Sequence, residues 1–204
     1  MQKIKPDYYN DLEKIYIKVW KLLNLGFENR DAPFHLPTFI CGSNNYFDGR
    51  IVVLRGVSEK EKKIWFHSDI RSNKIKELKS NPKSTLLFYD KIEKIQLRIS
   101  AITKINYQND ITNISWSKTP HMSRQCYLGD MAPGSNASLP TSGLTEKVDN
   151  LKYSLEESEG GYKNFCVIEN FIKSIEWLYL ASKGHRRAYF SFENNLLEKK
   201  WLIP

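Results

Sequence analysis

Basic and hydroxyl side chains recur at short spacing in the first half of the chain and could together bind a phosphate group. Arg50 and Arg55 bracket an apolar segment, while Arg71 and Lys74 flank Ser72 at the expected start of a short helix. Cations, a hydroxyl and the free backbone amides of a helix start are groups that bind phosphate well. The pattern therefore predicts an anion site.

The spacing of the two arginines limits how they could share this site. Because five residues separate Arg50 from Arg55, strict alternation along one strand would place them on opposite faces. Both could face one phosphate only if a β-bulge intervened. The residues alone also permit an interpretation without a ligand, in which the arginines keep an edge strand from pairing with another chain and water solvates the helix start.

The histidines and cysteines give no pattern typical of a metal site. His35, His67 and His121 have no spacing to one another or to a cysteine that suggests zinc or haem. We therefore predict no bound metal. The cysteines are odd in number, far apart and without a CxxC pair, so we expect free, mostly buried thiols at Cys41, Cys126 and Cys166.

Length, composition and charge limit the class of protein. A chain of 204 residues, 41% hydrophobic and 26% charged, suits one globular domain over residues 1–204. It has no apolar run long enough to span a membrane and no signal-peptide pattern, so we expect a cytoplasmic protein. The net charge of +8 suggests nucleic acid, an anionic membrane surface or a small phosphorylated ligand as a partner.

The first half of the chain alternates between helical and strand patterns. Apolar residues at helical spacing predict a helix over 7–25, followed by Gly26. A hairpin of two strands with a turn at NNYFDG is expected next, and its second strand contains Arg50 to Arg55. Ser72 is expected to cap a helix ending near Lys79, its hydroxyl accepting from amides of the first turn. Further strands are predicted at KIWFHSD, TLLFYD and EKIQLRISAITKI.

The second half predicts helices, one long loop and more strands. Helices are expected near 109–118 and 145–158, and a mobile loop rich in Pro, Gly, Ser and Asn over 130–145. Alternating apolar and polar residues after Asn164 predict three or four antiparallel strands. The predicted fold is mainly β with added helices (α+β), an antiparallel barrel that is closed or partly closed.

Five segments between Arg50 and the C-terminus, taken in their order along the chain, resemble a known family. The segments are RIVVLRGV, WFHSDIRSNKIKELKSNPKSTLLFYD, KIQLRISAITKI, IEWLYLASKGHRRAYF and WLIP. Over roughly residues 35–204, their order and spacing resemble the pyridoxamine 5'-phosphate oxidase-like flavoproteins. The resemblance implies an FMN-binding split barrel that forms a homodimer with FMN at the subunit interface.

The resemblance also assigns cofactor-binding positions. It implies that a strand runs beside the flavin, comprising Arg50, Ile51, Val52, Val53, Leu54 and Arg55. Flavin contacts would follow at His67 and Ser68, and phosphate contacts at Arg71, Ser72 and Lys74, where Asn73 replaces the family arginine. Gln96 would meet the edge of the ring, and Trp177 and Arg187 would come from the other subunit. Without the family resemblance, Gln96 would be interpreted as a solvent-facing strand residue, Trp177 as a core aromatic and Arg187 as a surface charge.

The resemblance is weaker where the family binds its substrate. In SWSKTPHMSRQ, Ser115 and Thr119 stand where the family has Tyr and Arg, and only Ser123 matches. Arg124 could replace the lost cation, and Lys183 and His185 match a substrate-covering Arg-x-His. His185 could transfer a proton, or it could be a turn residue without a role. We expect an anionic small molecule other than pyridoxamine phosphate itself.

The main hypothesis is an FMN-dependent oxidoreductase in which His185 and Arg55 face the substrate. One alternative keeps the flavin and drops catalysis, giving a carrier or sensor; another replaces FMN by a deazaflavin. A third is a basic barrel that binds nucleic acid. It is disfavoured because the lysines are interleaved with acidic residues such as Glu59, Glu61, Glu77 and Glu93.

Overall fold

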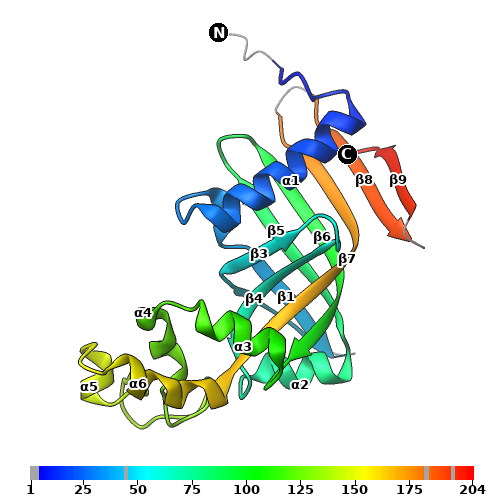
Figure 1. The fold of residues 1–204 in the computed structure, drawn as a ribbon. Helices are drawn as coiled ribbons and strands as arrows, with labels where there is room; N and C mark the ends of the chain where they lie inside the picture. Colours follow the sequence, from blue (N-terminus) through cyan, green and yellow to red (C-terminus); the bar gives the residue numbers. More distant parts are fainter. Residues whose placement is uncertain (1–4, 44–45, 182–183, 194–195) are drawn as a thin grey trace.

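The protein is an antiparallel β structure with helices at both ends (Figure 1). The computed structural model describes residues 5–43, 46–181, 184–193 and 196–204. In these residues the strands are β1 (Thr38–Ser43), β2 (Tyr46–Ile51), β3 (Leu54–Ser58), β4 (Lys63–Asp69), β5 (Lys83–Asp90), β6 (Ile95–Asn106), β7 (Phe165–Tyr179), β8 (Arg186–Glu193) and β9 (Leu196–Leu202).

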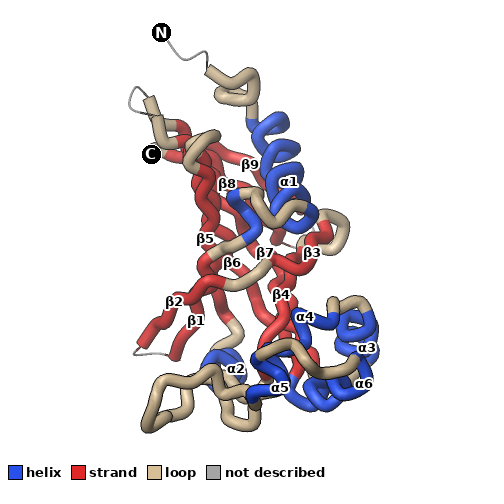
Figure 2. Tube along the Cα trace, turned by 90° about the vertical axis from the view of Figure 1, so that its left-hand side faces the viewer, coloured by secondary structure: helices blue, strands red, loops and turns tan. Residues whose placement is uncertain are grey.

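Short helices connect and cover these strands. They are α1 (Leu12–Glu28), α2 (Asn73–Ser80), α3 (Asp110–Ser117), α4 (His121–Arg124), α5 (Glu146–Asp149) and α6 (Leu155–Ser158), with single 3-10 turns at Pro33–His35, Gln125–Tyr127 and Glu159–Asn164. Figure 2 shows α1 near one end of the strands and α2 to α6 near the other. None of the described helices has the length and apolar character that crossing a membrane requires.

The sheet is open, and its two ends are neighbours in the sequence. The pairing order is β2-β1-β5-β6-β7-β4-β3, with every pair antiparallel and β8 and β9 branching from β7. Only Val52 and Val53 separate β2 from β3, the strands at the two ends of this path. The sheet must therefore curl until these ends approach each other. The prediction of a partly closed antiparallel barrel with helical additions is confirmed.

Strand β6 shows how the sequence pattern determines the core. Its alternating residues Ile95, Leu97 and Ile99 are fully buried, whereas Arg98 between them and Ser100 after them are exposed. Side chains of successive strand residues point to opposite faces, so this alternation assigns one face to the core. The alternation predicted for this strand is confirmed.

The opening helix begins and ends later than the sequence suggested. It spans 12–28 rather than 7–25, because the Asp11 side chain accepts hydrogen bonds from the amides of Glu13 and Lys14 and fixes the first turn there. Gly26 lies inside the helix instead of after it. A Cβ at this position would lie 2.7 Å from the backbone of Phe34, so the glycine is needed for close packing.

Three other local predictions are wrong. The segment from Arg50 to Val57 is two strands rather than one, since Val52 and Val53 form the crossing between the ends of the sheet. The expected turn before it includes the start of β2, at Tyr46. The expected helix over 145–158 is two short helices, interrupted where Leu151 adopts a φ of 56°. The segment over 130–145 is irregular as predicted, and its mobility stays a prediction.

Candidate functional site

A cavity of about 410 Å³ lies where the crossing between β2 and β3 meets the end of β4 and the start of α2. It brings together ten residues selected from the sequence: Arg50, Ile51, Val52, Val53, Arg55, His67, Ser68, Ser72, Lys74 and Ser123. Leu54, also predicted to lie beside the flavin, is buried in the core instead, with 2% of its surface exposed.

Lys74 is a partly buried cation of this cavity whose charge no described carboxylate balances by a salt bridge. Its ammonium group donates to the hydroxyl oxygens of Ser68, at 2.9 Å, and Ser72, at 3.0 Å. In the described part of the chain it forms no salt bridge with a carboxylate. Burial lowers the pKa of Lys74, and the nearby charge of Arg50 lowers it further. An anion bound here would supply the missing counter-charge.

Arg50 and Arg55 line the same cavity although strict alternation would separate them. The break at Val52 and Val53 and a register shift between Leu54 and Gly56 allow this arrangement. The need for an irregularity was anticipated from their spacing, and the structure supplies it.

The two arginines differ in their surroundings. Arg50 pairs with Asp48, lies 3.7 Å from Glu77 and donates to the Cys41 sulfur at 3.2 Å, so acidic groups already balance its charge. Arg55 lies near His67, whose pKa is lowered to about 3 by burial and by the Arg55 charge. His67 is therefore a neutral imidazole at neutral pH, with its ring centroid 4.8 Å from that of Phe165.

The turn before α2 is arranged differently from the prediction. Ser72 is the N-cap residue, as expected, but its hydroxyl donates to the Asp69 carbonyl at 2.7 Å and does not cap an amide. Arg71 is absent from the lining of the cavity. Its guanidinium pairs with Asp69 and donates to the carbonyl oxygens of Gly129 and Asp130, so Arg71 does not share this cavity with Lys74, and its contact with a phosphate stays a prediction.

The candidate substrate residues divide into two groups. Ser123 lines the cavity, together with Thr119, which the sequence had marked as a departure from the family. Arg124 does not, because it is buried at 5% exposure, pairs with Glu159 and lies 4.6 Å from the ring of Trp116. Its charge is balanced by Glu159 within the helical segment, and its role as a replacement cation stays a prediction that this placement does not favour.

Gln96 and the predicted residues near the C-terminus are absent from the lining of this cavity. Gln96 is half-buried on β6, paired with Leu178 of β7, and His185 is exposed just before β8. Arg187 on β8 pairs with Glu176. The Trp177 ring is fully buried, next to Tyr8 and Tyr179, so within this chain it is a core residue. Lys183 lies outside the described residues.

Sequence reasoning missed part of the cavity wall. Tyr127, Cys126 and Pro133 line it from the segment that follows α4. No spacing rule connects this segment to a cavity more than fifty residues earlier in the chain, so the sequence offered no signal beyond its proximity to Ser123. Cys126 is exposed, contrary to expectation, whereas Cys41 and Cys166 are buried as expected.

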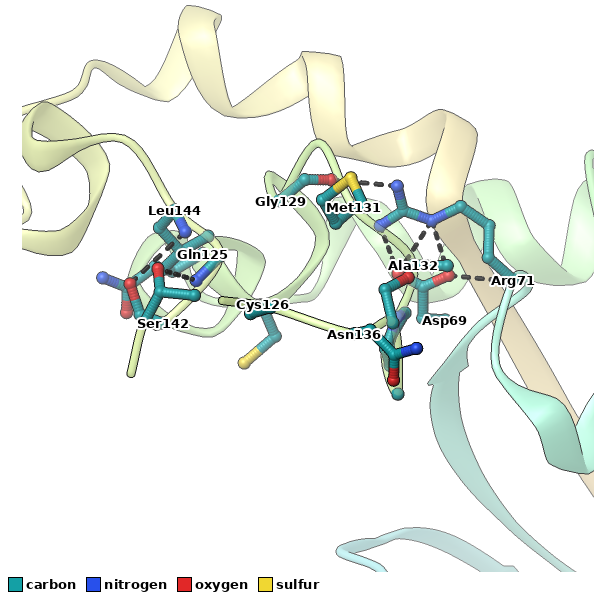
Figure 3. A pocket seen from close by; sticks show the side chains of 16 residues that line it. Asp69, Arg71, Gln125, Cys126, Gly129, Met131, Ala132, Asn136, Ser142 and Leu144 are labelled. Carbon is teal, nitrogen blue, oxygen red and sulfur yellow. Dashed lines mark hydrogen bonds and ion pairs between the residues drawn. The ribbon is translucent and has the colours of Figure 1, made fainter. Parts of the chain in front are cut away.

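A second cavity, of about 420 Å³, adjoins the first one and shares Asp69, Cys126 and Pro133 with it. The loop of residues 129–144 forms most of its wall, as Figure 3 shows, with Arg71 and Asp69 at one side. Within the described residues, no cluster of three or more His, Cys, Asp or Glu side chains is arranged to hold a metal ion.

Sequence comparisons identify relatives of the chain. Residues 21–106 match the family described as pyridoxamine 5'-phosphate oxidase, FMN-binding domain. A pyridoxine/pyridoxamine 5'-phosphate oxidase from Psychrobacter cryohalolentis is 27% identical over 212 residues, covering 95% of this chain and 92% of that protein. Another, pyridoxine/pyridoxamine 5'-phosphate oxidase 2 from Arabidopsis thaliana, is 24% identical and covers 86% of this chain and 89% of that protein.

Solved structures have the same fold. A pyridoxamine 5'-phosphate oxidase-related, FMN-binding protein from Nostoc punctiforme superposes with a TM-score of 0.70 at 14% identity, covering 98% of this chain and 100% of that one. PhzG from Burkholderia lata, solved with tetrahydrophenazine-1-carboxylic acid, gives 0.69 at 15% identity, covering 99% and 98%. The resemblance predicted from the ordered sequence segments is confirmed.

Proposed function

We propose that this chain, a relative by sequence and by fold of the pyridoxamine 5'-phosphate oxidases, binds FMN in the cavity beside β4 and α2. The observation that carries the proposal is Lys74. Its ammonium group is partly buried, is held by two serine hydroxyls and faces a cavity that Arg50 and Arg55 also line. Burying a cation is costly unless an anion compensates it, and the FMN phosphate is such an anion.

The start of α2 supplies further groups for the phosphate. The first amides of a helix have no intrahelical acceptor and carry partial positive charge, which favours an anion. Lys74 lies in this first turn, and the turn begins after Ser72. Arg50 would add charge at longer range, since Asp48 already pairs with it. Arg71 is left out of the phosphate contacts in this proposal.

The other end of the cavity would adjoin the flavin ring and the substrate. FMN supplies the redox chemistry in such a site, accepting a hydride equivalent and passing electrons on. The backbone of Val52 and Val53 would flank the ring, and Arg55 would stabilise negative charge that develops near it. His67, being neutral, would contribute a hydrogen bond rather than a charge. The substrate would be a small molecule contacting Ser123.

A second copy of the chain would complete the site. Gln96, His185 and Arg187 were assigned to flavin or substrate, yet they lie on β6 and at β8, outside the cavity of their own chain. A homodimer in which one copy's β8 approaches the cavity of the other would bring them there. Trp177 is left out of this proposal because its ring is fully buried within its own chain.

Reconstitution with FMN tests the proposal directly. The purified protein should retain FMN after desalting and show flavin absorbance with one FMN per chain. A protein that stays colourless and quenches no flavin fluorescence at high FMN would refute it. The mass of any copurifying molecule distinguishes FMN from a deazaflavin.

One observation favours a second candidate, a flavin carrier or sensor without turnover. Arg124, which was expected to bind the substrate, is committed to Glu159 and to carbonyl oxygens of the helical segment. The substrate end of the cavity is then left with Arg55 as its cation. Steady-state turnover with pyridoxine phosphate, pyridoxamine phosphate and reduced nicotinamides separates the candidates, since a carrier would bind FMN and oxidise none of them.

A further inference from the structure

The side chain of Arg71 connects the proposed flavin site to a distant part of the chain. Its Nε and Nη2 atoms donate to the Asp69 carboxylate, the latter at 2.7 Å. Its Nη1 atom donates to the carbonyl oxygens of Gly129, at 2.9 Å, and Asp130, at 3.1 Å. Each guanidinium nitrogen therefore has a partner, and the buried Asp69 carboxylate balances the charge.

The 129–144 loop, which begins at these two carbonyl groups, also borders the flavin cavity. Pro133 lines both this cavity and the adjoining one of about 420 Å³. The Cβ position of Gly134 lies 3.7 Å from the Nδ2 atom of Asn73, the first residue of α2. The loop therefore passes beside the helix start where the phosphate would bind, with Arg71 at its root (Figure 3).

We propose that Arg71 is a positioning residue that holds the 129–144 loop as a wall of the flavin site, and that it is not a phosphate ligand. This inference rests on the proposed function and extends it to control of ligand entry and exit. The bidentate contact with Asp69 fixes the guanidinium plane, and the remaining donors then fix the start of the loop. Without Arg71, the loop would lose the two side-chain contacts that hold its first residues against the turn before α2.

The kinetics of flavin binding test this role. In the Arg71→Ala protein, a loosened wall should increase both the association and the dissociation rate constants, each by about tenfold, the change expected from losing charge-assisted hydrogen bonds. FMN and riboflavin should respond equally, because in this proposal Arg71 makes no contact with the phosphate. A general loss of structure would not accelerate association, so this readout separates positioning from folding.

Three comparison variants sharpen the test. Lys74→Met should weaken FMN and spare riboflavin, the opposite of the pattern expected for Arg71→Ala. Gly134→Ala strains the loop, since Gly134 has a φ of 86°, and should reproduce the Arg71→Ala kinetics without removing any charge. Arg71→Lys should rescue them in part. Hydrogen exchange should rise within residues 129–144 of both loop variants and stay unchanged in β5 and β6.

Each outcome decides the inference. If Arg71→Ala weakens FMN but leaves riboflavin unchanged, Arg71 is a phosphate ligand and the inference is wrong. Unchanged rates for both flavins, with unchanged exchange in the loop, also overturn it. If the unaltered protein binds neither flavin, the proposed function fails instead, and the exchange experiment alone then tests the contact between Arg71 and the loop.

Discussion

Replacing Lys74 by methionine should weaken FMN binding while leaving riboflavin binding nearly unchanged. The side chain keeps a similar length and loses its charge, so the change is confined to the group that faces the anion. A hydrogen bond to a charged group contributes about 1.5–3 kcal/mol net, which corresponds to about a ten- to hundredfold increase in the FMN dissociation constant. Riboflavin has no phosphate and should change by less than about twofold.

The same variant should not destabilise the protein without ligand. Burial lowers the pKa of Lys74, which means that keeping this ammonium charged costs the folded chain free energy. Methionine removes that cost, together with the hydrogen bonds to Ser68 and Ser72. We therefore expect an unfolding free energy within about 1 kcal/mol of the original, whereas loss of an ordinary buried ion pair would lower it by more.

Titration with the two flavins, followed by fluorescence quenching, measures the effect, and Lys76→Met is the matched control. Lys76 lies on the same helix and is exposed, so its replacement changes net charge equally without touching the cavity. An equal loss of FMN affinity in both variants would attribute the effect to overall charge. An equal loss of FMN and riboflavin affinity in Lys74→Met would show that Lys74 does not recognise the phosphate. Either result refutes the reasoning.

Three further predictions concern stability. The pKa of His67 is about 3 in the folded protein and about 6.5 in the unfolded chain. The stability that the neutral imidazole contributes is therefore present above pH 6.5 and is lost as pH falls toward 3, by up to about 1.4 kcal/mol per pH unit. In His67→Gln, the free energy of unfolding measured in urea should depend less steeply on pH between pH 7 and 4. Arg124→Ala should lower the unfolding free energy by about 2–3 kcal/mol, because it removes the hydrogen bonds to the carbonyl oxygens of Thr119 and Trp116 and leaves Glu159 without its ion-pair partner. An unchanged unfolding free energy in chemical denaturation would contradict this structural role. Gly26→Ala should lower the free energy of unfolding by about 1–3 kcal/mol, and the melting temperature with it, because the new Cβ would collide with Phe34. This loss is expected although alanine favours helices. A higher melting temperature would disprove the contact.

The charge of the protein gains a more specific meaning from the cavity. Of the excess that gives +8, three cations, Arg50, Arg55 and Lys74, face one hollow. Other basic side chains pair with neighbouring acids at the surface, as Lys147 does with Glu157. A small phosphorylated ligand explains this clustering better than a polyanion would, because a polyanion would need basic groups spread along a continuous surface.

Much of the fold could be read from the sequence because local patterns directly reflect burial. The strict alternation in β6 could only satisfy a strand with one face in the core, and the polar turn at Ser58 to Lys62 could only connect strands. Ser72 also marked the start of α2, although its hydroxyl bonds elsewhere. The ordered segments, taken together, then indicated the resemblance to the pyridoxamine 5'-phosphate oxidase-like proteins that the comparisons confirm.

The composition of the site was decided by tertiary structure, because it depends on which residues meet across long separations. The sequence placed Arg71 and Lys74 on one turn. It could not show that Arg71 donates to the carbonyl groups of Gly129 and Asp130, whereas Lys74 faces the cavity. It offered Arg124 as a free cation, yet Glu159 pairs with it. Charge and spacing are properties of the chain, whereas the partner that neutralises or frees each charge is chosen only when the chain packs, and that choice determines which cations can bind a ligand.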